Sequence, residues 1–388
     1  MEKRFMGYVR SDGNVGIRNH VIIVPTTACA TGAVQRVAAM VPDLIPVLHT
    51  LGCGRPAEVG RLQRILGNVR NNPNHYAVIL FGLGCEGLAA EPVADILRAS
   101  GKPVSVFLMQ RDGGMEACVQ KAVQQARQYL KEAKECQRVP CPMSKLIIGT
   151  ECGSSDGLSG PLANQIIGYV SDWLVAQGGT TLLSESIELI GTEDILAERS
   201  VSPDVGRRAR AVVQAADEKL SAAIGWENAH RANSANLAGG ITTAEEKGLG
   251  CVKKGGTTPV TDVIGYAEPV GNRKGLIVAD GPVFDPESLA GLFGSGAQIA
   301  LFSTGRGNPL GYPTSPVIKI ASNDVTSALF EECTDINAGR IVSEKCSIPQ
   351  LGEEVIDYLC GILDGQLSAS ERSCQGGLLC IQTTTGAV

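Results

Sequence analysis

Short apolar runs alternate with amphipathic segments along most of this chain. The apolar runs at 20–25, 76–82 and 103–109 are each followed by a segment with helical spacing, at 31–41, 91–101 and 113–133. Apolar runs of this length between turn residues are typical of buried strands, and the longer periodic segments are typical of amphipathic helices. The alternation of strand and helix therefore predicts an α/β layer with a largely parallel sheet.

The pattern is interrupted once and then resumes. The helix predicted at 113–133 runs into a charged stretch, and VPCPMS (139–144) then breaks the periodicity. A second unit begins with KLIIGTECGSSDG (145–157) and continues with a helix at 164–179 and a strand at 180–186. We therefore expect two Rossmann-like α/β domains with largely parallel sheets, comprising residues 1–140 and 141–388.

Four cysteines come directly after predicted strands: Cys29, Cys53, Cys85 and Cys152. Ligands of open parallel sheets bind in the crevice outside the carboxyl ends of the strands, so we expect these thiols to line one site. The alternative is that they are small core residues, since free cysteine is commonly buried.

Composition and the start of the chain indicate the redox state of the cysteines. The chain has 13 cysteines, and its start, MEKRFMGYVR, lacks the apolar region of a secretory signal. We therefore expect a cytoplasmic protein whose cysteines are reduced thiols, metal ligands or catalytic groups. Converging thiolates suit an iron–sulfur cluster or zinc, and a cluster held by three cysteines would leave one iron open. The mononuclear alternative is Fe²⁺ or Mn²⁺ on His49 and a carboxylate.

Charge and hydropathy exclude two classes of partner. The formal net charge is -6 and charged residues make up 19% of the chain, which gives no electrostatic reason to expect nucleic acid or an anionic membrane. No apolar stretch reaches the roughly 18 residues of a transmembrane helix.

Several polar residues are candidates for substrate chemistry. His49 is a candidate general base, or else a loop histidine, and Arg18 is a candidate carboxylate clamp, or else half of an ion pair. Arg306 lies between two glycines in TGRGNP (304–309), a pattern suited to binding an anion. Thr242, Thr243 and Lys247 lie in a glycine-rich segment that we interpret as an active-site loop or a solvated turn.

Many blocks of the chain resemble one family, the altronate and galactarate dehydratases, in the same order. They are GYVRSDGNVGIRNHVIIVPTTACATG, HTLGCG, GLGCE, CGSSDGLSG, GGTTLLSES, AGGITTAEEKGLGC, FSTGRGNPLG, IKIASN and DINAG. One departure is RANSANLAGG (231–240), where the family often has a segment like NPSPGNKAGG. Polar residues inside the blocks complete the candidate list: Asn19, Ser155, Asp156, Glu185 and Asn308.

The resemblance implies a hydro-lyase that removes the proton α to a carboxylate of a sugar acid and expels the 3-hydroxyl, giving a 2-keto-3-deoxy acid. It implies iron as the cofactor. We expect Cys29, Cys53, Cys85 and Cys152 as its candidate ligands, and His49, Lys247 and Glu185 as candidate catalytic residues. Full-length members carry a small N-terminal SAF domain, so we expect a separate small SAF subunit as partner, and a homo-oligomer of the large chain. The alternatives are the large subunit of a (2R)-sulfolactate sulfo-lyase, which belongs to the same family, and a non-catalytic sugar-acid-binding protein.

Overall fold

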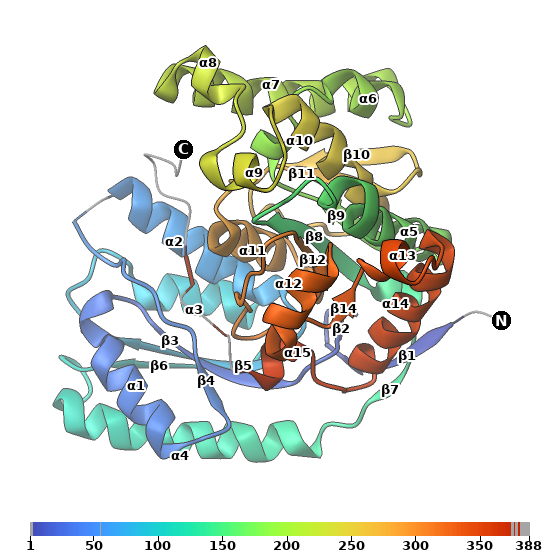
Figure 1. Ribbon diagram of the computed structural model, residues 1–388. Helices are drawn as coiled ribbons and strands as arrows, with labels where there is room; N and C mark the ends of the chain where they lie inside the picture. Colours follow the sequence, from blue (N-terminus) through green and yellow to red (C-terminus); the bar gives the residue numbers. More distant parts are fainter. Residues whose placement is uncertain (1–2, 55, 374–375, 377–378, 381–388) are drawn as a thin grey trace.

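The first sheet of the protein is parallel and four-stranded. The computed structural model describes residues 3–54, 56–373, 376 and 379–380 (Figure 1). The sheet has the order β4-β3-β5-β6, formed by β3 (His20–Pro25), β4 (Leu44–Pro46), β5 (His75–Gly82) and β6 (Val104–Leu108). Strand and helix alternate here as the apolar pattern predicts.

Both faces of this sheet are covered by helices, which explains its continuous apolar runs. The covering helices are α1 (Thr31–Met40), α2 (Pro56–Asn68), α3 (Ala90–Arg98) and α4 (Gly114–Glu135). Because successive side chains of a strand point to opposite faces, Val21 and Ile23 pack in the core with α1 and α4, whereas Ile22 and Val24 pack with α2 and α3.

The second sheet is parallel, has seven strands in the order β10-β11-β9-β8-β12-β13-β14, and positions the candidate site. Its strands are β8 (Ile147–Gly153), β9 (Thr180–Leu183), β10 (Val260–Ile264), β11 (Gly275–Ala279), β12 (Ile299–Thr304), β13 (Val317–Ala321) and β14 (Ile336–Asn337). The prediction of an α/β fold with two largely parallel sheets is thus confirmed. The domain boundary at 140/141 stays a prediction.

Helices cover both faces of the second sheet as well. The longer ones are α5 (Asn164–Ala176), α7 (Pro203–Ile224), α10 (Ala244–Cys251), α11 (Asp285–Gly294) and α14 (Ile348–Leu363). The shorter ones are α6 (Glu193–Glu198), α8 (Trp226–Ala229), α9 (Ser234–Ala238), α12 (Asp324–Leu329), α13 (Arg340–Ser343) and α15 (Ala369–Arg372). In β12, Leu301 packs in the core with α5 and α14, whereas Phe302 packs with α11 on the other face.

A third, antiparallel sheet was not anticipated from the apolar pattern. β1 (Arg4–Val9) pairs with β2 (Val15–Gly16) and with β7 (Val139–Pro142), so the start of the chain lies beside the segment that joins the two larger sheets. None of the helices in the part of the chain that the structure describes is long and apolar enough to cross a membrane.

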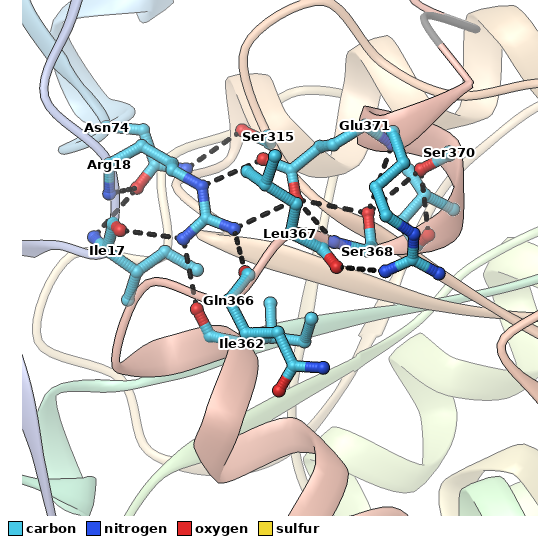
Figure 2. A network of polar contacts seen from close by, with 12 residues as sticks. Ile17, Arg18, Asn74, Ser315, Ile362, Gln366, Leu367, Ser368, Ser370 and Glu371 are labelled. Carbon is cyan, nitrogen blue, oxygen red and sulfur yellow. Dashed lines mark hydrogen bonds and ion pairs between the residues drawn. The ribbon is translucent and has the colours of Figure 1, made fainter.

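Arg18 links the start of the chain to its C-terminal part. Its guanidinium makes a bidentate ion pair with Glu371, with both N–O distances 2.8 Å, and also donates to the carbonyls of Ile17, Ile362 and Gln366 (Figure 2). Arginine has five N–H donors, and all five have an acceptor here. This geometry leaves no donor of Arg18 for a substrate carboxylate, so it favours a structural role.

Candidate functional site

Two pockets at the carboxyl end of the seven-stranded sheet share Lys247 as a lining residue. The smaller has a volume of about 290 Å³, and its lining includes Ser155, Asp156, Glu246, Lys247 and Cys251. The larger has a volume of about 510 Å³, and its lining includes Glu188, Arg231, Asn233, Asn236 and Lys247. Ser155 and Asp156 follow β8, and the other residues named here lie between β9 and β10, so both pockets are formed where a parallel sheet binds its ligands.

A buried polar cluster centred on Cys152 contributes residues to both pockets. Cys152 Sγ lies 2.7 Å from Glu188 Oε2, 3.4 Å from Cys251 Sγ and 3.1 Å from Lys254 Nζ. Lys254 also forms an ion pair with Glu185, which accepts a hydrogen bond from the Cys152 backbone N–H at 3.0 Å. Buried polar groups are costly unless they are paired, and these pair with one another.

Local structure explains how these side chains meet. Cys152 lies near the end of β8, whereas Glu185 and Glu188 lie in the turn after β9. Lys247 and Cys251 are four residues apart on α10, which places them on one face of that helix. Glu185 has a φ of 70°, a conformation that is costly for a residue other than glycine, and such strain is concentrated at functional sites.

The cluster contains two neighbouring carboxyl groups whose pKa values are shifted in opposite directions. Burial, followed by the negative charge of Glu188, raises the pKa of Glu185 to about 8, although Lys254 opposes this. Burial alone would raise the pKa of Glu188, but Lys247 and Lys254 hold it below its ordinary value. Lys247 Nζ lies 2.5 Å from Glu188 Oε1, and this contact holds the pKa of Lys247 above its ordinary value despite burial. Environments that separate two pKa values in this way are typical of acid–base sites.

A second group of carboxylates shares Glu185 with this cluster. Glu151, Glu185 and Asp285 each have an oxygen within 4.8 Å of the others. Burial and the charge of Glu185 raise the pKa of Glu151 well above its ordinary value, and one of its buried oxygens has no hydrogen-bond partner among the described residues. Burial likewise raises the pKa of Asp285 to about 6.

The structure brings part of the predicted residues together at the pockets. Lys247, Ser155 and Asp156 line the smaller pocket, and the buried hydroxyl of Ser155 has no partner among the described residues. Glu185 lies behind the pockets, in the cluster. Arg306 donates to the carbonyl of Ala235 at 3.0 Å, in the segment 231–240 that contributes to the larger pocket.

Other predicted residues have local partners and do not line these pockets. Thr243 caps α10, Thr242 donates to Glu246 Oε2 at 2.7 Å, and Asn308 donates to Asp285 Oδ2 at 2.6 Å. Asn19 accepts from Arg10 at 2.7 Å.

His49 also lies outside the pockets. Its Nε2 is 2.6 Å from the Pro25 carbonyl, and its Nδ1 accepts from the Leu51 N–H at 3.2 Å, so both ring nitrogens are occupied. Burial lowers the pKa of His49. These contacts favour a neutral histidine that supports the loop before Cys53.

The four predicted thiols do not form one cluster. Cys29, Cys53 and Cys85 are exposed, whereas Cys152 is buried. Within the described residues, Cys152 groups with Glu188 and Cys251, and none of the exposed thiols belongs to a group of three or more ligand atoms within 4.8 Å of one another.

The structure therefore offers groups of side chains that are compatible with a metal, without showing which metal. The buried group of Cys152, Glu188 and Cys251 already contacts two lysine ammonium groups, and a cation there would be repelled by them. The exposed thiols have no such competing charge among the contacts described for them. Cysteine sulfur is a soft ligand that suits iron or zinc.

Sequence reasoning missed three members of the cluster: Glu188, Cys251 and Lys254. A signal was present for two of them. Glu188 follows Glu185 by three residues in SESIEL, and Cys251 follows Lys247 by four residues in KGLGC, so each lies one helical turn from a residue that was predicted.

Comparison with known proteins identifies the class of protein that carries this fold and site. Residues 143–385 match the family described as D-galactarate/Altronate dehydratase, C-terminal, and residues 7–134 match D-galactarate dehydratase/Altronate hydrolase, second domain. The chain belongs to this family of sugar-acid dehydratases. The resemblance stated from the sequence and the prediction of an enzyme of the hydro-lyase class are confirmed.

Individual relatives are similar over most of the chain. It is 33% identical to altronate dehydratase of Bacillus subtilis (strain 168) over 384 residues, which cover 96% of this chain and 76% of the relative. It is 34% identical to altronate dehydratase of Escherichia coli (strain K12), over 94% of this chain and 75% of the relative. It is 33% identical to the (2R)-sulfolactate sulfo-lyase subunit beta of Chromohalobacter salexigens, over 95% of each chain.

Proposed function

We propose that this chain eliminates water from a sugar acid such as altronate or galactarate and yields a 2-keto-3-deoxy acid. The observation that carries the proposal is the Lys247–Glu188 ion pair, because Lys247 lines both pockets and Glu188 lines the larger one. Such an elimination needs a proton acceptor and a positive charge beside the carboxylate on which negative charge develops.

The chain's own residues supply both requirements. Glu188 is held ionised by Lys247 and Lys254, so its carboxylate is available to accept the proton α to the substrate carboxylate. Lys247 keeps its positive charge within 2.5 Å of Glu188, where it stabilises the developing enediolate. Glu185 forms an ion pair with Lys254 and accepts a hydrogen bond from the Cys152 backbone N–H, so it holds both residues in place behind the pockets.

Iron is the cofactor that we propose, with thiolates as its ligands. When bound, iron with an open position supplies a Lewis acid for a hydroxyl or carboxylate oxygen of the substrate. We also propose that the chain acts in the cytoplasm, as a homo-oligomer, together with a separate small subunit of the SAF type. The relative named as a subunit beta, which matches this chain over 95% of both lengths, supports a two-subunit enzyme.

The second candidate function is elimination of sulfite from (2R)-sulfolactate. The same subunit beta supports it, and so does the lining of the larger pocket. Ala232, Asn233, Ser234 and Leu237 all line this pocket and all lie in the segment 231–240, where the chain departs from the family pattern.

The test is a substrate panel on the anaerobically purified chain, alone and with a small SAF subunit. Altronate, galactarate, other hexonates and aldarates, and sulfolactate are each assayed for 2-keto acid and for sulfite. We expect 2-keto acid from one hexonate or aldarate, only when the small subunit is present, and its loss in Lys247→Met. Sulfite release would assign the second function, and binding without turnover of any acid would identify a sugar-acid-binding protein.

A further inference from the structure

Exposure separates three cysteines from the others that the structure describes. Cys29, Cys53 and Cys85 are exposed, whereas every other cysteine in the described residues is buried or half-buried. Free cysteine is among the most buried residue types, so an exposed thiol is unusual and three on one edge of a sheet require an explanation.

The three thiols follow three adjacent strands. Cys29 follows β3, Cys53 follows β4 and Cys85 follows β5, and the order of these strands in the sheet is β4-β3-β5. Neighbouring strands lie about 4.8 Å apart, so loops that leave the same ends of adjacent strands run beside one another. All three loops leave the carboxyl edge of the sheet, because the strands are parallel.

Direct contacts hold these loops together. The N–H of Ala28 donates to the Leu51 carbonyl at 2.8 Å, which joins the loop of Cys29 to the loop of Cys53. Thr26 donates to the carboxylate of Glu86, which joins the same strand end to the loop of Cys85.

Glycine lets the loops approach closely. A Cβ at Gly52 would lie 2.5 Å from Thr27 Cα, and Gly52 has a φ of 143°, so no larger residue fits without rearrangement. On the other side, a Cβ at Gly87 would lie 3.7 Å from Cys53 Cα, which brings the segment after Cys85 against Cys53. The thiol-bearing loops therefore form one contiguous surface.

We propose that Cys29, Cys53 and Cys85 bind an iron–sulfur cluster and leave one of its irons without a protein ligand. The inference rests on the proposed function only for the choice of iron, and it separates these three thiols from the buried Cys152. A single tetrahedral ion with metal–sulfur bonds of about 2.3 Å would need its sulfurs about 3.8 Å apart. The three sulfurs do not all lie within 4.8 Å of one another, whereas a cluster takes one thiolate on each of several irons.

The experiment measures cluster content independently of turnover. The wild-type chain and the single variants Cys29→Ser, Cys53→Ser and Cys85→Ser are reconstituted anaerobically with iron and sulfide, and bound iron, acid-labile sulfide and visible absorbance are measured per chain. Cys152→Ser and Cys136→Ser are the controls, because Cys136 is a half-buried thiol that donates to the Glu132 carbonyl at 3.6 Å. Melting temperatures show that each variant is folded.

We expect wild type and both controls to retain iron and sulfide. Each of the three variants should bind at least fivefold less iron and sulfide per chain than wild type, with an unchanged melting temperature. Retention of iron and sulfide in the triple variant Cys29→Ser/Cys53→Ser/Cys85→Ser would overturn the proposal. Loss of the cluster in Cys152→Ser, or binding of one iron or zinc without sulfide, would overturn it as well.

Turnover of the same preparations separates this inference from the proposed function. If the wild-type chain dehydrates a sugar acid without bound iron and sulfide, the cluster proposal is wrong and the proposed dehydratase function stands. If the chain binds the cluster but converts no acid with the small subunit present, the proposed dehydratase function is wrong and the cluster proposal stands.

Discussion

Lys319 provides a quantitative test of how much the burial of a charged group beside the second sheet costs in stability. It lies on β13, is fully buried, and its ammonium nitrogen has no hydrogen-bond partner in the described part of the chain. The nitrogen lies 3.3 Å from the ring centroid of Phe302. Burial lowers the pKa of Lys319 from 10.5 to about 7, although Asp285 and Glu151 oppose the shift.

The cost of this burial depends on pH in a defined direction. Between pH 7 and 10.5 the unfolded chain binds the proton and the folded chain does not, so stability rises with pH across this window. Relative to a neutral side chain, the lysine destabilises the fold by about 4 kcal/mol at pH 7 and by about 2 kcal/mol at pH 9. The penalty is complete below pH 7 and disappears above pH 10.5.

Replacing Lys319 by methionine keeps an unbranched side chain and removes the titration. We expect Lys319→Met to be more stable than wild type in urea unfolding, with a gain that shrinks by about 2 kcal/mol between pH 7 and pH 9. Lys131→Met, on the exposed side of α4, is the matched control and should show no such pH dependence. A variant that is less stable by the same amount at both pH values would refute the reasoning, because it would mean that Lys319 is paired and charged in the fold.

Three further predictions concern the candidate site and its surroundings. Lys247→Met should lower kcat/KM at least a hundredfold, because it removes the positive charge beside the developing enediolate; unchanged kinetics would remove the Lys247–Glu188 pair from the mechanism. Arg18→Met should lower the free energy of unfolding by roughly 3–5 kcal/mol because it leaves Glu371 unpaired, while kcat/KM measured below the melting transition stays the same. Arg306→Lys should lower kcat/KM at least tenfold, about 1.4 kcal/mol, because lysine lacks the guanidinium that can donate to the Ala235 carbonyl and to a substrate carboxylate together; an unchanged value would exclude Arg306 from the site.

The regular elements were predictable where both faces of a strand are buried. The apolar run at 20–25 coincides with β3, and that at 76–82 lies within β5, because each of their successive side chains enters one of two cores. The antiparallel sheet was not predictable in this way. Phe5 pairs with Cys141, and a strand whose partner is so distant along the chain leaves no local pattern at either position.

Strand ends were a useful guide to the candidate site, but they do not say which sheet a strand joins. Cys29, Cys53, Cys85 and Cys152 each follow an apolar run in the same manner. A chain with two parallel sheets has two carboxyl edges. Strand pairing determines the edge at which each strand ends. β3 pairs with β4 and β5, whereas β8 pairs with β9 and β12, so the fourth thiol lies at the carboxyl edge of the other large sheet.

The role of a charged residue depends on partners that local sequence does not contain. Arg18 and Lys247 both lie in blocks typical of the family, yet Arg18 is saturated by Glu371 and three carbonyls from Ile17 and the C-terminal part of the chain. Lys247 has Glu188 beside it and two pockets in front of it. A side chain whose donors are all satisfied inside the protein has none to offer a ligand, whereas a charged pair that lines a pocket can exchange part of its contact for one with the substrate. Lys247 is therefore the stronger candidate for catalysis because it lines both pockets, whereas every donor of Arg18 already has a partner inside the protein.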